Sequence, residues 1–214
     1  RVFTERHRAC VSFEREDVAG GRLSHGYDDG APAVYACPPA SLRLNAEVIG
    51  VYRDAGPLFL AVLQAGRLHL VYPRVLLLTN GGHPTLTAFA NNDLPGVYAG
   101  RAVSRLIRRH ALLAGERVAL VGDPSEARAL AKVITAAGGS AIIAEGTPVS
   151  ANGVNRVHSL TVQPLKGPAQ TLECDAIACC EPAGAAYELA VAAGAHTEFS
   201  DRSQAFVVTA DSQG

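Results

Sequence analysis

The stretch that most constrains the fold is ERVALVGDPSEARALAKVITAAGGSAIIAEG, residues 116–146. It holds a short apolar run, a turn, a helical segment and a second apolar run that ends in an acid. This order predicts a strand, a crossover helix and a parallel strand, which is the outline of a mononucleotide-binding half. A strand pair joined through a helix places the chain in the α/β class.

The turn in this stretch departs from the glycine-rich fingerprint of dinucleotide sites. It reads G-D-P-S-E-A from Gly122 to Ala127, where G-x-G-x-x-G is typical. Gly122 supplies the tight turn and Ala127 is small enough for close packing of the helix on the sheet. Pro124 lacks the N–H group that a pyrophosphate would use. Asp123 and Glu126 suit the positive end of the helix dipole, but they would repel a phosphate.

Glu145 ends the second apolar run about 20 positions after Gly122, where an acid typically binds the ribose hydroxyls of a dinucleotide. An acid at that place favours NAD over NADP, because it would repel a 2′-phosphate. The alternative is a packing unit without a ligand, in which Asp123 or Ser125 only caps the helix. On the turn alone, the two interpretations stay open.

An internal repeat extends the prediction to a second unit. An acid-ended apolar run, β-rich segments and an apolar run leading into a glycine-containing turn occur across 10–82 and again across 118–184. The repeat predicts two nucleotide-binding domains of one design in tandem. In the first copy Glu14 stands where the ribose-binding acid is expected, and Gly20 and Gly21 follow it.

The other segments are assigned from periodicity and turn residues. Strands are expected at 46–52, 58–64 and 67–73 as an antiparallel meander, at 74–82 as a fully apolar parallel strand, at two or three places within 153–180, and within 205–214. A helix is expected over 97–115, ending at Gly115, and a helix followed by a strand over 185–199.

Composition excludes several classes of function. Apolar residues make up 48% of the chain and charged residues 18%, with a net charge of −1, so the chain is globular and has no basic stripe for nucleic acid or an anionic membrane. No run of apolar residues is long enough for a membrane span, and the first residues lack the apolar core of a signal peptide. A cytoplasmic location is expected because the cysteine usage fits a reduced compartment. Histidine spacing gives no metal site.

The five cysteines show neither a C-x-x-C motif nor a zinc spacing. Cys179 and Cys180 lie in an apolar run and are expected to act as small core residues, with a redox disulfide as the alternative. The chain begins with Arg1 and contains no methionine, so we expect a fragment or a processed chain. If the usual spacing holds, the strand and glycine-rich turn that precede Glu14 lie before Arg1.

Four segments together resemble the two-dinucleotide-binding-domain flavoproteins, in particular the alpha subunits of heteromeric amine and amino-acid oxidoreductases. These include heterotetrameric sarcosine oxidase, dye-linked proline dehydrogenase, opine oxidase and hydrogen cyanide synthase. The segments are FEREDVAGGRL (13–23), RVLLLTNGGHP (74–84), NNDLPGVYAGRAVSRLIRRHALLAGERVALVG (91–122) and CDAIACCEPAGAAYELAVAAGA (174–195), of which 91–122 is the most specific.

The resemblance implies two tandem Rossmann-like FAD/NAD(P)-binding domains of the glutathione-reductase type, each with a small antiparallel β meander. It implies an incomplete FAD domain over 1–96 with 200–214, and an NAD-binding-like domain over 97–199. The implied cofactors are FAD in the first domain and NAD, or a remnant of its site, in the second. The implied partners are a second flavoprotein subunit, which carries the carbon chemistry, and a small amine or amino-acid substrate.

Carried onto this chain, the resemblance implies cofactor contacts for ten residues, and it names no catalytic base. They are Glu14 at the FAD ribose, Gly20 and Gly21 on the flavin side, Val48 at the adenine through its backbone, Thr79, Gly81 and Gly82 closing over the cofactor, and Gly122, Ala127 and Glu145 at the second nucleotide. The family's alanine-threonine-glycine turn is altered here, with Thr79 shifted by one position, and Pro124 degrades the second fingerprint.

Two other functions compete with this reading. A non-catalytic structural or assembly domain with vestigial nucleotide sites is favoured by Asp123 and Pro124. An NADH-dependent disulfide or quinone reductase is disfavoured, because the sequence has no redox C-x-x-C motif.

Overall fold

The computed structural model describes residues 10–21, 41–53, 56–201, 203 and 205–210. These residues form two compact units. The first comprises the described parts of Arg1–Ser24, Gly30–Gly82 and Gly184–Gly214, and the second comprises His83–Ala183. The contacts therefore divide the chain after Gly82 and after Ala183. The assignment of the two units to an FAD-type and an NAD-type domain stays a prediction.

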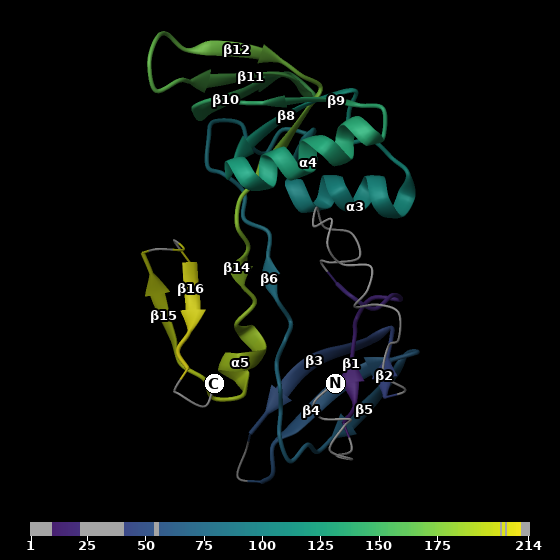
Figure 1. Cartoon of the computed structure of the whole chain (residues 1–214). Helices are drawn as coiled ribbons and strands as arrows, with labels where there is room; N and C mark the ends of the chain where they lie inside the picture. The colour runs from purple at the N-terminus through teal and green to yellow at the C-terminus, as the bar shows by residue number, and fades with distance from the viewer. Residues whose placement is uncertain (1–9, 22–40, 54–55, 202, 204, 211–214) are drawn as a thin grey trace. The chain divides into compact units, whose positions relative to one another are not determined.

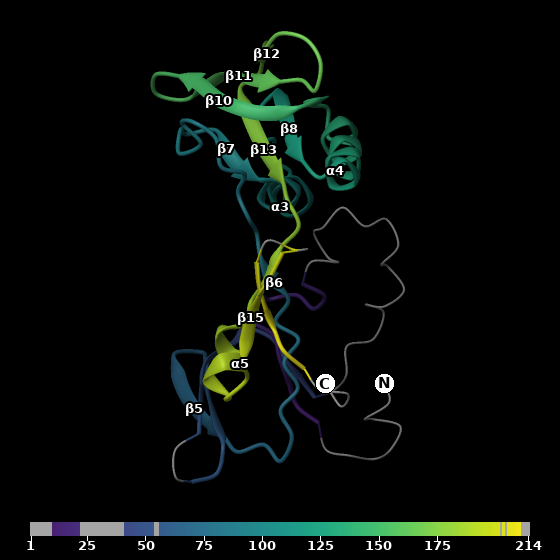
Figure 2. The same cartoon turned by 90° about the vertical axis from the view of Figure 1, so that its left-hand side faces the viewer.

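The second unit is a parallel sheet with helices on one face and a meander on the other (Figures 1 and 2). The sheet order is β7-β13-β8-β9, and all three pairings are parallel. The meander is antiparallel, in the order β10-β11-β12. The bounds are β7 Val97–Ala99, α3 Gly100–His110, β8 Arg117–Gly122, α4 Pro124–Ala136, β9 Ser140–Ile143, β10 Thr147–Gly153, β11 Val157–Gln163, β12 Gln170–Glu173 and β13 Ala176–Cys180.

Alternation along the two central strands builds a core on each face of this sheet. On one face, Val118 and Leu120 of β8 pack with Leu130 and Ile134 of α4, all fully buried. On the other face, Val121 of β8 joins a cluster that includes residues of the meander. Because both faces are covered, β13 is buried at every position, as the unbroken apolar run in its sequence predicts.

The first unit contains a parallel strand pair, a meander and two short strand pairs. The meander order is β3-β4-β5, antiparallel throughout, while β1 pairs with β2 in parallel. The bounds are β1 Ser12–Phe13, β2 Leu42–Arg43, β3 Ala46–Tyr52, β4 Phe59–Gln64, β5 Arg67–Val71, β6 Gly82–His83, β14 Gly184–Ala185, α5 Glu188–Ala192, β15 Thr197–Ser200 and β16 Ala205–Val208. The predicted α/β class, with a meander in each unit, is confirmed.

The predicted strand over 74–82 is wrong for most of its length. Only Gly82 enters a strand, β6, which pairs with β14. Val75 and Leu77 are 79% and 70% exposed, while Leu76 packs against the meander core. A parallel strand is buried by neighbours on its edges and faces, and no described strand pairs with 74–81.

The predicted helix over 97–115 is also too long. Val97–Ala99 form β7, because they pair with β13 at the edge of the sheet. Helix α3 then ends at His110, where Ala111 adopts a left-handed conformation with φ of 53° and caps the last turn. Helical periodicity does not reveal this edge strand, since its partner lies far away in the sequence.

Candidate functional site: strand-terminal acids and the β8–α4 turn

Two acids, one in each unit, follow a strand that belongs to a parallel pair. Glu14 directly follows β1, which runs parallel to β2. Glu145 lies just beyond Ile143, the last residue of β9, which runs parallel to β8. Both acids therefore stand at the carboxyl ends of strands in parallel pairs, where ligands of α/β sheets collect.

Backbone and side-chain hydrogen bonds hold Glu14 in place. Its N–H donates to the carbonyl of Arg43 at 2.8 Å, and its carbonyl accepts from the N–H of Ala46 at 2.9 Å. The half-buried Glu14 carboxylate accepts one hydrogen bond, at 3.0 Å, from the N–H of Glu16. A carboxylate has further acceptor sites, so Glu14 retains capacity for hydroxyl donors.

The glycines that follow Glu14 adopt backbone conformations that other residues rarely take. Gly20 has φ of 112° and Gly21 has φ of 49°. No heavy atom of the described chain lies within 4 Å of a Cβ built on Gly21. Apart from the chain neighbours of Gly21, the described residues therefore leave the space beside this turn open, as a close approach to a ligand would require.

The remaining predicted residues of the first unit fall on other elements. Val48 lies on β3, opposite Val62 of β4 and next to an irregularity in the strand pairing. Thr79 is exposed in the extended segment before β6. Gly81 accepts a hydrogen bond from the N–H of Ala186 at 3.0 Å, and Gly82 belongs to β6. The predicted turn at 79–82 is thus held to the segment around β14.

The turn after β8 requires glycine at its first position. Gly122 has φ of 105°, and a Cβ there would lie 3.0 Å from the carbonyl carbon and oxygen of Cys180. Ala127 is 1% exposed in the cluster between α4 and the sheet, which confirms its predicted packing role. Glu145 is exposed at the end of β9.

Asp123 caps helix α4. Its carboxylate accepts from the N–H of Ser125 at 2.8 Å and from the N–H of Glu126 at 3.0 Å, and the Ser125 hydroxyl donates to it as well. The hydrogen bonds from the Ser125 side chain and the Glu126 backbone lower the pKa of the Asp123 carboxyl from its usual value. The carboxylate therefore remains charged at neutral pH.

Glu181 is a site residue that the sequence reasoning missed. It directly follows β13, and its carboxylate accepts from the Thr87 hydroxyl at 2.6 Å. The same carboxylate lies 2.9 Å from the position of a Cβ on Gly122. An acid right after an apolar strand is the signal that singled out Glu14 and Glu145, so the residues A-C-C-E at 178–181 carry it too.

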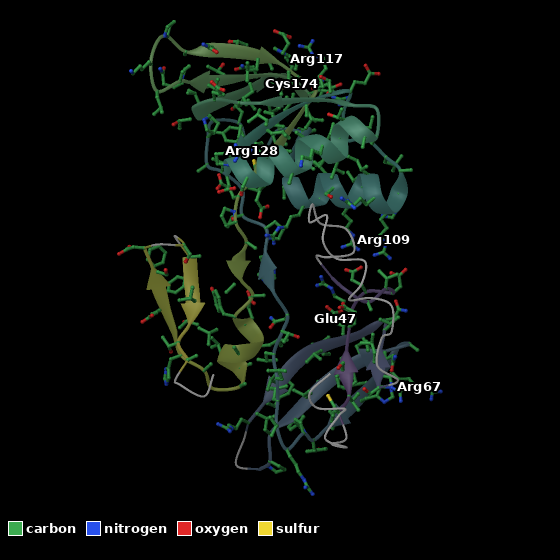
Figure 3. The ribbon with its side chains drawn as sticks, in the orientation of Figure 1. Glu47, Arg67, Arg109, Arg117, Arg128 and Cys174 are labelled. Atoms are coloured by element: carbon green, nitrogen blue, oxygen red, sulfur yellow. The ribbon has the colours of Figure 1, made fainter. Side chains whose placement is uncertain are left out.

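Two arginines near the β8–α4 turn interact with its carboxylates. Arg101 of α3 lies 3.6 Å from the carboxylate of Glu126. Arg128, labelled on α4 in Figure 3, helps to lower the pKa of Asp123 through its positive charge. Both arginines therefore act on carboxylates of this turn.

The three cysteines of the second unit, Cys174, Cys179 and Cys180, are buried, which confirms the predicted core role of Cys179 and Cys180. Cys179 and Cys180 are 2% and 0% exposed, and both are free thiols. Burial raises the pKa of the Cys180 thiol to about 12 and that of the Cys174 thiol, labelled in Figure 3, to about 11. Such thiols stay protonated and unreactive. Cys37 lies outside the described residues.

Among the described residues, no group of three or more histidine, cysteine, aspartate or glutamate side chains is arranged to hold a metal ion. None of the described helices has the length and apolarity that a membrane span requires.

Comparison with known proteins identifies the fold through structure alone. No family model and no curated protein matches the sequence. An L-proline dehydrogenase from P. horikoshii is similar over 94% of this chain, with a TM-score of 0.76 and 15% identity. A thioredoxin reductase from T. acidophilum is similar over 94%, with a TM-score of 0.60 and 13% identity. A pyridine nucleotide-disulfide family oxidoreductase from Enterococcus faecalis is similar over 98%, with a TM-score of 0.60 and 11% identity.

The chain spans only part of these proteins. It covers 42% of the proline dehydrogenase, 77% of the thioredoxin reductase and 53% of the Enterococcus protein. All three are oxidoreductases by name. At these identities the likeness establishes a Rossmann-type α/β fold, and what the chain binds or does has to be argued from the site.

Proposed function

We propose that this chain is part of a flavin-dependent oxidoreductase that removes a hydride from an amine or amino acid. The observation that carries the proposal is the place of Glu14, at the carboxyl end of a parallel strand and ahead of two glycines with positive φ. The similarity to an L-proline dehydrogenase, at a TM-score of 0.76, supports this substrate class.

In this proposal, FAD is held by the first unit. Glu14 accepts hydrogen bonds from the ribose hydroxyls, for which its carboxylate has capacity besides the bond from Glu16. Gly20 and Gly21 let the backbone approach the cofactor, since no described residue beyond the chain neighbours fills the Cβ position at Gly21. When bound, FAD would supply a redox group that accepts the electrons passed on from the substrate.

Val48, Thr79, Gly81 and Gly82 are further proposed contacts in this unit, and a second flavoprotein subunit is the proposed partner. The described residues offer no pair of groups that stands out as an acid and a base. The proposal therefore assigns the carbon chemistry to that subunit, and to this chain cofactor binding and the passage of electrons.

The test is to isolate the chain from its native cells, with the proteins that bind it, and to record flavin absorbance and substrate-dependent dye reduction. We expect a yellow complex that reduces the dye with L-proline, sarcosine or a related amine. A colourless preparation, whose melting temperature FAD does not raise, would contradict the proposal.

A variant of Glu14 sharpens the test. We expect Glu14→Ala to weaken FAD binding by about tenfold or more, because it removes hydrogen bonds to a charged acceptor. The matched control is Glu198→Ala, which changes an exposed acid on β15 of the same unit and should leave FAD binding unchanged. Equal affinities in both variants would remove Glu14 from the site.

A structural or assembly subunit is the second candidate. It is favoured by the cap at Asp123, which satisfies N–H groups that a nucleotide phosphate would otherwise bind. The two candidates differ in their response to FAD, since only the first requires the complex to hold flavin.

A further inference from the structure

The N-terminus of α4, described in full, has no N–H group left for a phosphate. Pro124, the first residue of the helix, has none. Ser125 and Glu126 donate theirs to the Asp123 carboxylate, and Ala127 donates its N–H to the Asp123 carbonyl at 2.9 Å. In a dinucleotide site, the pyrophosphate accepts from groups at this position. The Asp123 carboxylate thus occupies the anion position at the helix N-terminus that a ligand phosphate would otherwise take.

A second carboxylate lies in the crevice beside this turn. Strand β8 has β9 on one side and β13 on the other, so the chain order reverses between β8 and β13. Ligands of open α/β sheets bind outside the carboxyl ends of strands at such a reversal. Glu181 emerges there, 2.9 Å from the Cβ position of Gly122, and the hydroxyl of Thr87 holds it at 2.6 Å.

The segment that carries Thr87 is itself attached to this edge. The Thr85 hydroxyl donates to the carbonyl of Pro182, and Asn92 donates to the carbonyl of Thr87 at 3.1 Å. These hydrogen bonds hold Thr87 in place, and Thr87 in turn holds the Glu181 carboxylate. Two carboxylates in this position repel an incoming pyrophosphate, and Arg101 is already paired with Glu126.

We infer that the β8–α4 turn is closed to dinucleotides, with Asp123 in place of the pyrophosphate at the helix and Glu181 filling the space beside Gly122. The second unit keeps the architecture of an NAD domain while its own acids exclude NAD. Glu145 then stands at the end of β9 without a ribose to bind. This inference concerns the second unit and holds whether or not the first unit binds FAD.

The experiment is a titration of the unsubstituted chain with NADH, followed by NMR of the backbone amides and by NADH fluorescence. We expect no shift at Ser125, Glu126 or Ala127 and no saturable binding at millimolar NADH. Saturable binding accompanied by shifts of those amides would overturn the inference without any variant being made.

A variant without the blocking residues should gain affinity for NADH, and this gain is the second test of the inference. The triple change Asp123→Ala, Pro124→Gly, Glu181→Ala removes both carboxylates and restores an N–H group. We expect NADH to bind the triple variant roughly tenfold or more tighter, because like charge near the phosphate is removed. No gain in a folded variant would overturn the inference.

Two single variants test the charge of Glu181 and the role of Glu145 separately. Glu181→Gln keeps the shape and the acceptor for Thr87, removes the charge and should give a smaller gain than the triple change. Glu145→Ala should leave the fluorescence titration unchanged, whereas an occupied NAD site would lose affinity with this acid. An FAD titration of the same samples reports separately on the first unit, so failure of one proposal is distinguishable from failure of the other.

Discussion

Two apolar segments with similar sequence patterns have different structures in the two units. AIACC, residues 176–180, forms β13 between β7 and β8 and is buried at every position. VLLLT, residues 75–79, follows the first meander as AIACC follows the second, yet forms no described strand, and Val75 and Leu77 are largely exposed. The hydrophobicity of both segments predicts a buried strand. A strand forms and becomes buried where partner strands offer hydrogen bonds on its edges.

The same contrast extends to the faces of the two segments. β13 has the helix cluster on one side and the meander cluster on the other. In the 75–79 segment, Leu76 alone contacts the core cluster of the first unit. In the second unit, the central strand is therefore contacted on both edges and both faces. Among the described residues of the first unit, only the meander core contacts the 75–79 segment.

The largest expected effect tests this contrast directly. Ile177→Ala, at a position 0% exposed in β13, should lower the free energy of unfolding by about 2–5 kcal/mol, because it leaves a cavity between packed layers. Leu77→Ala, at a position 70% exposed, should change it by less than about 0.5 kcal/mol. Urea unfolding followed by circular dichroism measures both.

A large effect of Leu77→Ala would show that the 75–79 segment is covered in solution. The two segments would then not differ in burial, and a lack of partner strands would not explain their different structures.

The turn glycines give the next effect in size. Gly122→Ala would place a Cβ 3.0 Å from the Cys180 backbone at φ of 105°, and should cost about 2–3 kcal/mol of stability. Gly21→Ala has open space and φ of 49°, in the left-handed helical region, and should cost only about 1 kcal/mol. Thermal unfolding of the two variants measures the difference, and equal costs would mean that the Cys180 contact relaxes freely.

The sequence predicts the second unit well because its signals are local. The apolar run of β8, the Asp123 cap, the helical period of α4 and the acid at Glu145 all lie within one stretch of about 30 residues. Repetition of that pattern predicts Glu14 as the corresponding acid, and Glu14, like Glu145, follows a strand of a parallel pair.

The errors come from contacts between residues far apart in the sequence. The sequence predicts a helix where β7 forms, because the partner of β7, β13, lies about 80 residues away and no local period indicates that pairing. The place of Glu181 beside Gly122 depends on β8 and β13 being neighbours. The apolar composition of residues 74–81 predicts a strand, but composition does not indicate whether a partner strand is available.

The smallest expected effect compares two carboxylates that each accept the N–H two residues ahead. Asp123 accepts from Ser125 at 2.8 Å and also from Glu126, while Glu14 accepts from Glu16 at 3.0 Å. Asp123→Ala removes a helix cap and should cost about 1 kcal/mol at neutral pH. Glu14→Ala frees no helix end and should cost less.

Acidification separates the cap from a simple loss of packing. The pKa of Asp123 is lower in the folded chain than its ordinary value of 3.8, so its stabilisation is complete above that value and is lost as the pH falls through the folded pKa. The stability difference between the unsubstituted chain and Asp123→Ala should therefore shrink below about pH 4. Asp123→Ser keeps a capping oxygen without a titrating group, and should recover most of the stability at neutral pH while losing less of it in acid. Urea midpoints measured for the three proteins from neutral to acidic pH test this order, and parallel curves would mean that the carboxylate charge contributes nothing to the cap.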